Sequence, residues 1–482
     1  MTLPPEHDPR LTVRLAANTL VQAVGNALAS VVGFFTFVAM TRGLGPDAFG
    51  DFTAATVFLF IPVVLADVGL SAALLREISA DPERTAPAMS AALPLRLLIS
   101  AGTIVVALAV GLAIPFDGRT KVAIAISSLG ALFTLMTLSL MPVLQARLRM
   151  HLSVGATLVG RVTTLALTLG ALGVGLGFKA LVGAHVVGLA VTFVLHLWAV
   201  RRIVPLRLVV DRVYWRRLLA GSLALGLAIA LSQVYFRVDT VIVALLRSSE
   251  EVGYYGAAYK FVELAVLVPG AVGVSMFPPL ARFVATGDPR ANGLIQKSFD
   301  VLLVTAVPVM VLMLAYPEDM VSITAGDQFR EAATAVRILA PFALFAFVGG
   351  VLWRVLMAAD KDRMLLAMAV FILAVNIALN LVFVPLYGFE AAAAITVASE
   401  ALVLIPIAYG VWREGRLPNL RYGAAIALAA AAMAATILLL PGPALVVGAV
   451  ASGVYGAVLL VLPGTARDFV RGDLLPALRE RG

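Results

Sequence analysis

Apolar segments of about 20 residues recur along the whole chain, and this repetition constrains the fold more than any other feature. Of the 482 residues, 61% are hydrophobic and 13% are charged, and the mean hydropathy is +1.00. A helix of about 20 apolar residues is long enough to cross a hydrocarbon core of about 30 Å. The sequence therefore predicts an all-α polytopic membrane protein.

Fourteen transmembrane helices are expected from these segments. The predicted spans are residues 15–41, 52–75, 91–114, 122–146, 152–176, 180–200, 218–246, 254–284, 299–316, 333–357, 364–384, 391–411, 422–440 and 444–462. The first segment is too long for the apolar core of a signal peptide, so we expect it to be retained as a helix.

Lysine and arginine are distributed unevenly between the two sides of these spans. With Arg282, near the end of the span 254–284, counted in the connection that follows it, the N-terminus, the even-numbered connections and the C-terminal tail carry 24 of the 36, the other connections carry six, and six lie within spans. Because basic residues are in excess on the cytoplasmic side, both termini are predicted to be cytoplasmic. The segment 201–217 holds six arginines and one acid, Asp211. It suits a topology anchor between lobes, and recruitment of anionic lipid headgroups is the alternative.

Two pairs of short motifs indicate an internal repeat. GDFTAA at 50–55 matches GYYGAA at 253–258, and GFKA at 177–180 matches GFEA at 388–391. The motifs occupy equivalent places in two sets of six spans, as in transporters built from related halves. We therefore predict an N-terminal six-helix lobe at 1–200, a basic cytoplasmic interlobe loop at 201–217, a C-terminal six-helix lobe at 218–411, two appended helices at 412–462 and a cytoplasmic tail at 463–482.

Composition also argues against several kinds of chemistry. The chain has no cysteine, and its four histidines lack metal-ligand spacing, so neither a disulfide nor a metal site is expected. A glycine-rich phosphate-binding loop with its lysine is absent, so we expect no nucleotide hydrolysis. The formal charge of +8 lies mainly in short loops, where topology explains it without nucleic acid. We expect no cofactor and no enzyme activity, since a membrane glycosyltransferase or polymerase would need partnered acids or a large outer loop.

Charged side chains within the predicted spans are the main candidates for a functional site. The stretch 235–264 carries Arg237, Asp239, Lys260 and Glu263, and Arg161 lies in the middle of the fifth span. A charge at the bilayer centre costs about 2.5–3.5 kcal/mol on insertion scales, so such residues normally face a cavity, a partner or a bound ion. Three further arginines near helix ends are expected to extend to the membrane interface: Arg96, Arg337 and Arg354.

Five ordered segments resemble one known family. They are TRGLGPDAFGDFTAA at 41–55, DVGLSAALLREIS at 67–79, RVDTVIVALLRSSEEVGYYGAAYKF at 237–261, ITAGDQFREAATAVRILAP at 323–341 and VPLYGFEAAA at 384–393. The chain resembles the polysaccharide-biosynthesis flippases, the O-antigen and exopolysaccharide branch of the multidrug/oligosaccharidyl-lipid/polysaccharide exporter superfamily. The resemblance implies a two-lobed bundle in the bacterial cytoplasmic membrane that moves an undecaprenyl-pyrophosphate-linked oligosaccharide to the outer leaflet by alternating access. The implied partners are this lipid-linked oligosaccharide and membrane lipid, with a polysaccharide polymerase and other assembly proteins as further candidates.

The charged residues can be matched to such a substrate. Arg161, Arg237 and Lys260 are predicted to bind the diphosphate, because arginine matches phosphate oxygens with a planar fork and lysine supplies a point charge. The alternative for Arg161 is a structural pair between helices.

Three acids are predicted to couple transport to an ion: Asp239, Glu263 and Glu400. A carboxyl group that changes surroundings as a cavity changes access can exchange a proton. The alternative for Glu263 is a plain ion pair with Lys260, one helical turn away.

Two other functions remain open. A drug or organic-cation antiporter of the same superfamily would share the architecture but use a smaller, more acidic cavity. A membrane scaffold of an envelope-synthesis complex would have no need for charges inside its spans.

Overall fold

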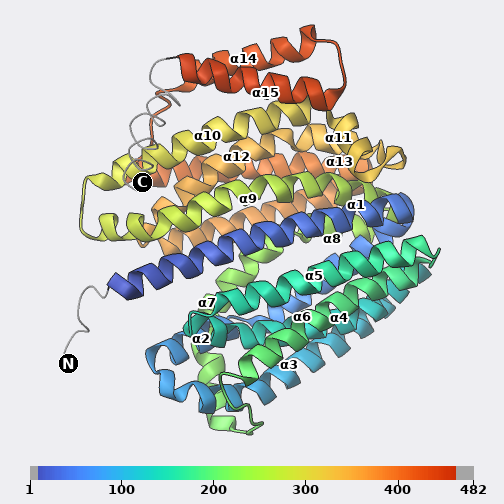
Figure 1. Cartoon of the computed structure of the whole chain (residues 1–482), viewed down its shortest axis with the longest axis vertical. Coiled ribbons are helices and arrows are strands. Elements are labelled where there is room, and N and C mark those ends of the chain that lie inside the picture. The colour runs from blue at the N-terminus through green and yellow to red at the C-terminus, as the bar shows by residue number, and fades with distance from the viewer. Residues whose placement is uncertain (1–8, 463–482) are drawn as a thin grey trace. The chain divides into compact units, whose positions relative to one another are not determined.

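The computed structural model describes residues 9–462, which form α-helices and two short 3-10 helices without any strand (Figure 1). The chain divides into two compact units, residues 1–256 and 257–482. The predicted cytoplasmic tail at 463–482 lies outside the described residues, and the predicted lobe boundaries stay a prediction.

The described part of unit 1 is built from eight α-helices, one 3-10 helix and the beginning of a ninth α-helix. In chain order they are α1 (Pro9–Asp67), α2 (Leu70–Ala80), η1 (Pro82–Arg84), α3 (Thr85–Ala113), α4 (Gly118–Ala146), α5 (Met150–Gly173), α6 (Phe178–Arg201), α7 (Arg212–Tyr235), α8 (Val238–Leu246) and the first turns of α9 (Ser249–Ala285).

Unit 2 contains the remainder of α9 and the helices that follow it. These are α10 (Arg290–Ala315), α11 (Pro317–Ala325), η2 (Asp327–Phe329), α12 (Ala332–Ala358), α13 (Asp362–Arg413), α14 (Gly423–Leu439) and α15 (Ala444–Val461).

The predicted class, an all-α polytopic membrane protein with about fourteen spans, is confirmed. Ten helical segments of the described chain are long and apolar enough to cross a membrane. Two of these, Val24–Ala80 and Asp362–Arg413, contain a kink, at Gly45 and Gly388 respectively, that separates two of the predicted spans. The 24-residue α7 and the apolar 17-residue α14 correspond to the predicted spans that begin at residues 218 and 422.

Both kinks fall at glycines. Gly45 has φ 76° and ψ 170°, and Gly388 has φ 65° and ψ −152°. Only glycine adopts these conformations without strain, because it lacks a Cβ. Pro46 follows the first kink and has no N–H to donate to the preceding turn. The glycines therefore mark where one span ends and the next begins, as the predicted boundaries at 41–52 and 384–391 require.

The structure differs from the prediction at residues 218–246, which were expected to form one helix. The helix instead breaks at Phe236 and Arg237, and α8 begins at Val238. The break contains neither glycine nor proline, so no helix-breaking residue marks it in the sequence. Its consequence is that Arg237 is the N-cap residue of α8 rather than a residue inside one continuous helix.

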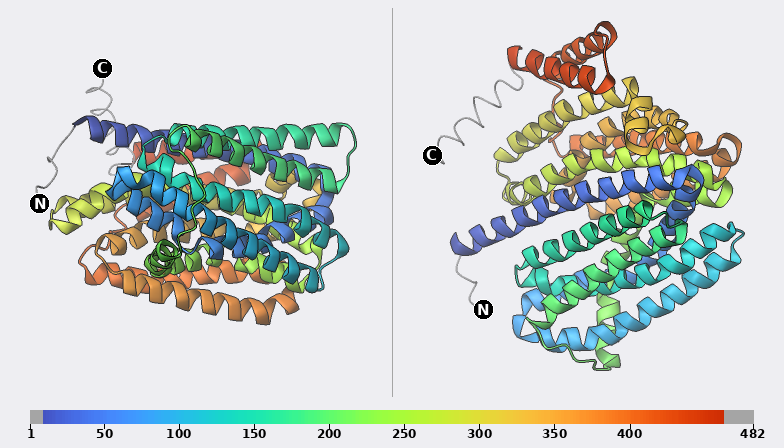
Figure 2. Two further views of the ribbon diagram at one scale, coloured as in Figure 1. Left: turned by 90° about the horizontal axis from the view of Figure 1, so that it is seen from below. Right: turned by 45° about the vertical axis from the view of Figure 1, so that its right-hand side comes forward.

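Within unit 1, α4 packs against α1, α2, α3 and α6, and α5 packs against α1 and α6 (Figures 1 and 2). Small residues allow α5 and α6 to approach closely. A Cβ added to Gly160 would lie 2.6 Å from the Gly188 carbonyl oxygen, and one added to Gly188 would lie 2.7 Å from the Gly160 carbonyl oxygen. Such close approach over small residues is typical of helix pairs in membranes.

The expectation that Arg96 reaches the interface is wrong. Its side chain is only 3% exposed and forms an ion pair with Asp67, Nη1 to Oδ1 at 2.7 Å. The second guanidinium nitrogen donates to the hydroxyl of Ser71 at 2.7 Å, and that hydroxyl donates to Asp67. Asp67 ends α1 and Ser71 lies in α2, so Arg96 of α3 holds the bend between these two helices.

The start of α9 crosses α1 within unit 1, and the two repeat motifs meet at this crossing. A Cβ on Gly50 would overlap the carbonyl oxygen of Ser249, and a Cβ on Gly253 would overlap the carbonyl oxygen of Pro46. The neighbouring Asp51 is 2% exposed and accepts a hydrogen bond from the Ser249 hydroxyl at 2.7 Å. Backbone contact and a buried carboxylate therefore fix the crossing together.

Two apolar cores hold together the described helices of unit 2. One joins α9, α10, α12 and α13 around Phe299, Phe347 and Leu356, and the other joins α10 to α14 and α15. The hydroxyl of Tyr455 in α15 donates to the carbonyl of Val304 in α10 at 2.9 Å. The two C-terminal helices are therefore packed onto α10 rather than separate from the unit.

The two remaining arginines with predicted interfacial positions belong to unit 2. Arg337 is half exposed and forms an ion pair with Glu318 at 2.8 Å. Arg354 is half-buried and donates to the carbonyl of Gly350 at 2.7 Å.

Candidate functional site: a cation-lined cavity in unit 1

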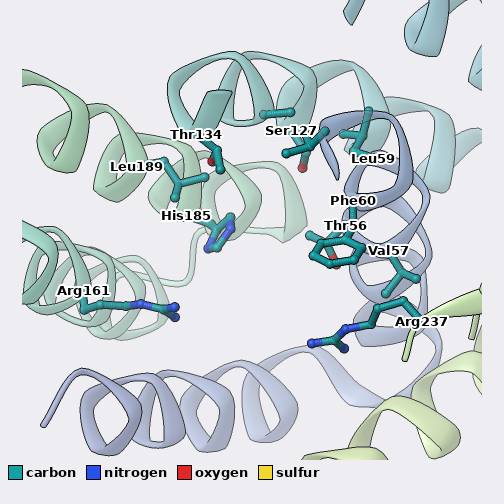
Figure 3. Close-up of a pocket in the computed structure, with 12 residues that line it drawn as sticks. Thr56, Val57, Leu59, Phe60, Ser127, Thr134, Arg161, His185, Leu189 and Arg237 are labelled. Carbon is teal, nitrogen blue, oxygen red and sulfur yellow. The ribbon is translucent and has the colours of Figure 1, made fainter. Parts of the chain in front are cut away.

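A cavity of about 380 Å³ lies among the helices of unit 1 (Figure 3). Its walls come from α1, α4, α5, α6 and the junction of α7 with α8. The twelve lining residues are Thr56, Val57, Leu59, Phe60, Val63, Ser127, Ala131, Thr134, Arg161, His185, Leu189 and Arg237. Two of the predicted substrate-binding residues thus line one cavity, and no acid is among its twelve lining residues.

Arg161 projects from the middle of α5 and reaches α1. A Cβ added to Gly33 of α1 would lie 3.3 Å from Nη1 of Arg161. Any larger residue at position 33 would thus press on the guanidinium. Glycine at this place therefore leaves room for the arginine head group beside the first helix.

Arg237 reaches the same cavity from the opposite side. In Figure 3, the side chains of Arg161 and Arg237 extend toward one another. The Cζ atom of Arg237 lies 5.8 Å from the centre of the Phe60 ring, within the range of a cation–π contact. The break between α7 and α8 sets this position, because Arg237 is the residue that precedes α8.

Neutral polar groups form the rest of the polar lining. The Thr56 hydroxyl donates to the Phe52 carbonyl at 3.0 Å, and the Thr134 hydroxyl donates to the Gly130 carbonyl at 3.0 Å. The ring of His185 meets that of Phe52 edge to face, with ring centres 5.4 Å apart. The cavity therefore combines two fixed cations with uncharged hydrogen-bonding groups.

Asp239 is not among the lining residues. It is 2% exposed and accepts a hydrogen bond from the Tyr255 hydroxyl at 2.6 Å and another from the Thr240 backbone N–H at 2.6 Å. Asp239 thus connects α8 to the first turns of α9, both within unit 1.

The other predicted site residues belong to unit 2. Lys260 and Glu263 form an ion pair at 2.7 Å on one face of α9, and each side chain is 28% exposed. Glu400 is half-buried in α13.

Sequence reasoning did not identify the neutral part of the cavity. The sequence offered no metal-ligand spacing for His185 or the other histidines, and Ser127 carried no expectation. The sequence around each residue gives no signal, because a serine or a histidine in an apolar helix has the same kind of sequence neighbours whether it faces a cavity or packs against another helix. Only the packing of α4 and α6 around the cavity reveals them.

The fold and the cavity define a multi-pass helical membrane protein with a cation-lined chamber inside one of its helical units. Residues 15–284 match the model of the family described as polysaccharide biosynthesis protein, and residues 224–382 match that of the MatE family. Because the first match covers more than half of the chain, the protein belongs to the polysaccharide biosynthesis protein family.

Two curated relatives come from Haloferax volcanii. The chain is 22% identical to the probable low-salt glycan biosynthesis flippase Agl15 over 169 residues, which is 35% of this chain and 36% of the relative. It is 26% identical to the probable flippase AglR over 172 residues, again 35% of this chain and 36% of the relative. Each match thus spans about a third of the relative's length.

Solved structures share the fold at low sequence identity. The inward closed form of the lipid II flippase MurJ aligns with a TM-score of 0.77 and 13% identity, covering 92% of this chain and 99% of that one. An inward-facing multidrug resistance MATE transporter of the MOP superfamily aligns with a TM-score of 0.65 and 17% identity, covering 84% and 98%. These likenesses establish the fold.

Proposed function

We propose that the protein is a flippase that moves a polyprenyl-diphosphate-linked oligosaccharide across the bacterial cytoplasmic membrane by alternating access, for the synthesis of a cell-surface polysaccharide. The observation that carries the proposal is the pair of arginines, Arg161 and Arg237, directed into one cavity whose lining contains no acid. The family match and the flippase relatives support it.

The chemistry of the cavity suits a diphosphate. A guanidinium offers parallel N–H donors that match two phosphate oxygens, and the resulting hydrogen bonds are strengthened by charge. An arginine within a membrane span costs about 2.5–3.5 kcal/mol on insertion scales, so such a residue normally faces a cavity, a partner or a bound ion. Two arginines that line the same cavity therefore suit a ligand that carries more than one negative charge.

The remaining parts of the proposal concern coupling and topology. Lys260, which belongs to unit 2, is a further candidate to bind the diphosphate. Binding would then break the ion pair between Lys260 and Glu263. Asp239 and Glu400 are the other candidates for proton exchange. Protonation of Asp239 would weaken the hydrogen bond that its carboxylate accepts from the Tyr255 hydroxyl. We propose cytoplasmic termini, two lobes at 1–200 and 218–411, and a polysaccharide polymerase among the partners.

Transport of a fluorescent polyprenyl-diphosphate oligosaccharide in proteoliposomes tests the proposal. We expect Arg161→Ala and Arg237→Ala to lose translocation, whereas Arg161→Lys and Arg237→Lys retain part of it because the positive charge remains. Arg84→Ala is the matched control, since Arg84 lies at the surface with a side chain 64% exposed. If both alanine variants translocate as fast as the Arg84→Ala protein, the arginine pair does not bind the substrate and the proposal loses its basis.

A second function has one specific observation in its favour, the MatE match at residues 224–382. An antiporter for organic cations would exchange a labelled quaternary ammonium compound across the same vesicles. Such exchange by a protein that moves no lipid-linked sugar would support the antiporter. A protein that moves neither substrate would point to the scaffold.

A further inference from the structure

Ser127 differs from the other serines and threonines of α4. The hydroxyls of Ser128, Thr134, Thr137 and Ser139 each donate to the backbone carbonyl four residues earlier, at 2.7–3.0 Å. Ser127 lines the cavity, is 5% exposed, and its hydroxyl has no hydrogen-bond partner among the residues that the structure describes. A buried hydroxyl without a partner carries a desolvation penalty, so this one is available to a ligand or a water molecule in the cavity.

The other neutral groups of the cavity complement Ser127. The donors of Thr56 and Thr134 are already engaged with the backbone, so these two hydroxyls offer acceptor lone pairs. His185 presents a ring that has both a donor and an acceptor when neutral. In Figure 3, Ser127 and Thr134 lie on one helix above the two arginines, with His185 between them and Arg161. The cavity thus has a cationic side and an uncharged side with mixed donors and acceptors.

These two sides fit a ligand that has an anionic part joined to a neutral part rich in hydroxyls. Sugar hydroxyls both donate and accept, so they can use the free Ser127 donor and the threonine acceptors together. We infer that Ser127, with Thr134 and His185, binds the sugar ring next to the diphosphate and sets the preference for a glycosylated lipid. The inference rests on the proposed function, in which the arginines hold the diphosphate.

Binding of two lipids to the purified full-length protein tests the inference. The probes are a polyprenyl-diphosphate oligosaccharide and the same polyprenyl diphosphate without sugar. We expect Ser127→Ala to weaken binding of the glycosylated lipid by about 2- to 12-fold, the range of one net hydrogen bond. Binding of the sugar-free lipid should be unchanged. Ser128→Ala is the matched control. The Ser128 hydroxyl is next to Ser127 in the chain, but it donates to the carbonyl of Ile124, and Ser128 does not line the cavity.

A second variant guards against an effect of Ser127→Ala on folding. His185→Phe preserves a ring against Phe52 but removes both nitrogens, and it should produce the same selective loss. The inference is overturned if Ser127→Ala binds the glycosylated lipid as well as the Ser128→Ala protein does, or if the two probes weaken equally. Failure of the native protein to bind either probe would instead refute the proposed function, so the two failures are distinguishable.

Discussion

Replacing Gly188 by alanine should separate helices α5 and α6. The added methyl would lie 2.7 Å from the Gly160 carbonyl oxygen and would overlap the hydroxyl of Thr164. The backbone oxygen cannot move independently, and Thr164 is held because its hydroxyl donates to Gly160 at 3.1 Å. Two costs therefore add: overpacking, about 1–3 kcal/mol, and the disturbed threonine hydrogen bond, about 0.5–1.5 kcal/mol.

The same helix provides the control. Gly183 also lies in α6, but a Cβ placed there meets nothing within 4 Å. Both substitutions gain the same helix propensity, about 0.8–1.0 kcal/mol, so this gain cancels when the two variants are compared. We expect Gly188→Ala to unfold more easily than Gly183→Ala by about 1.5–4.5 kcal/mol.

Reversible unfolding in mixed detergent micelles measures this difference. The reciprocal variant Gly160→Ala should behave like Gly188→Ala, and the double variant should cost less than the sum, because one added methyl already separates the helices. Equal stability of Gly188→Ala and Gly183→Ala would show that the crossing is not tightly packed, and the reasoning would fail.

Three further predictions concern buried or paired charges. Arg96→Met should lower the free energy of unfolding by about 3–5 kcal/mol because it leaves the carboxylate of Asp67 without its cation, and adding Asp67→Asn should restore part of the loss in the same assay. Asp51→Ala should cost about 1–3 kcal/mol because it removes the acceptor of the Ser249 hydroxyl at the crossing of α1 with α9, whereas Asp51→Asn should cost less. Hydrogen bonds from Arg290 lower the pKa of Asp288, in the connection between α9 and α10. The contribution of the Asp288 carboxylate to stability is therefore fully present above a pH of about 4 and is lost as the pH falls through the lowered pKa. Asp288→Asn should flatten the pH dependence of the free energy of unfolding in this acidic range.

Much of the fold was predictable because membrane helices leave a strong signal in hydropathy. Glycines at positions 45 and 388 also end their spans where the sequence indicated. The break before α8 was not predictable, because Phe236 and Arg237 are not helix breakers and tertiary packing determines their conformation. The burial of Arg96 was missed for a related reason: its partner Asp67 lies 29 positions earlier in the chain, beyond the reach of helical periodicity.

The site divides along similar lines. Arg161 and Arg237 were identifiable from sequence because charge inside an apolar span is expensive and therefore conspicuous. That they share one cavity depends on how α1, α4, α5 and α6 pack, which no local pattern encodes. A serine in a membrane helix normally bonds to its own backbone, so the exceptional state of Ser127 becomes visible only when its surroundings are known.

At the crossing of α1 with α9, the first repeat motif packs against the second repeat motif. Pro46 and Ser249 lie 203 residues apart, as do Gly50 and Gly253, so the contact of Gly50 with Ser249 is the same contact as that of Gly253 with Pro46 under this shift. Such reciprocity is the property of a twofold dimer interface, here formed inside a single polypeptide. A residue type that both motifs have at the same position therefore occurs at two equivalent contacts. A side chain that is too large for one of these contacts is too large for the other as well. Glycine at positions 50 and 253 therefore allows the two repeats to pack against each other in the same way from both sides.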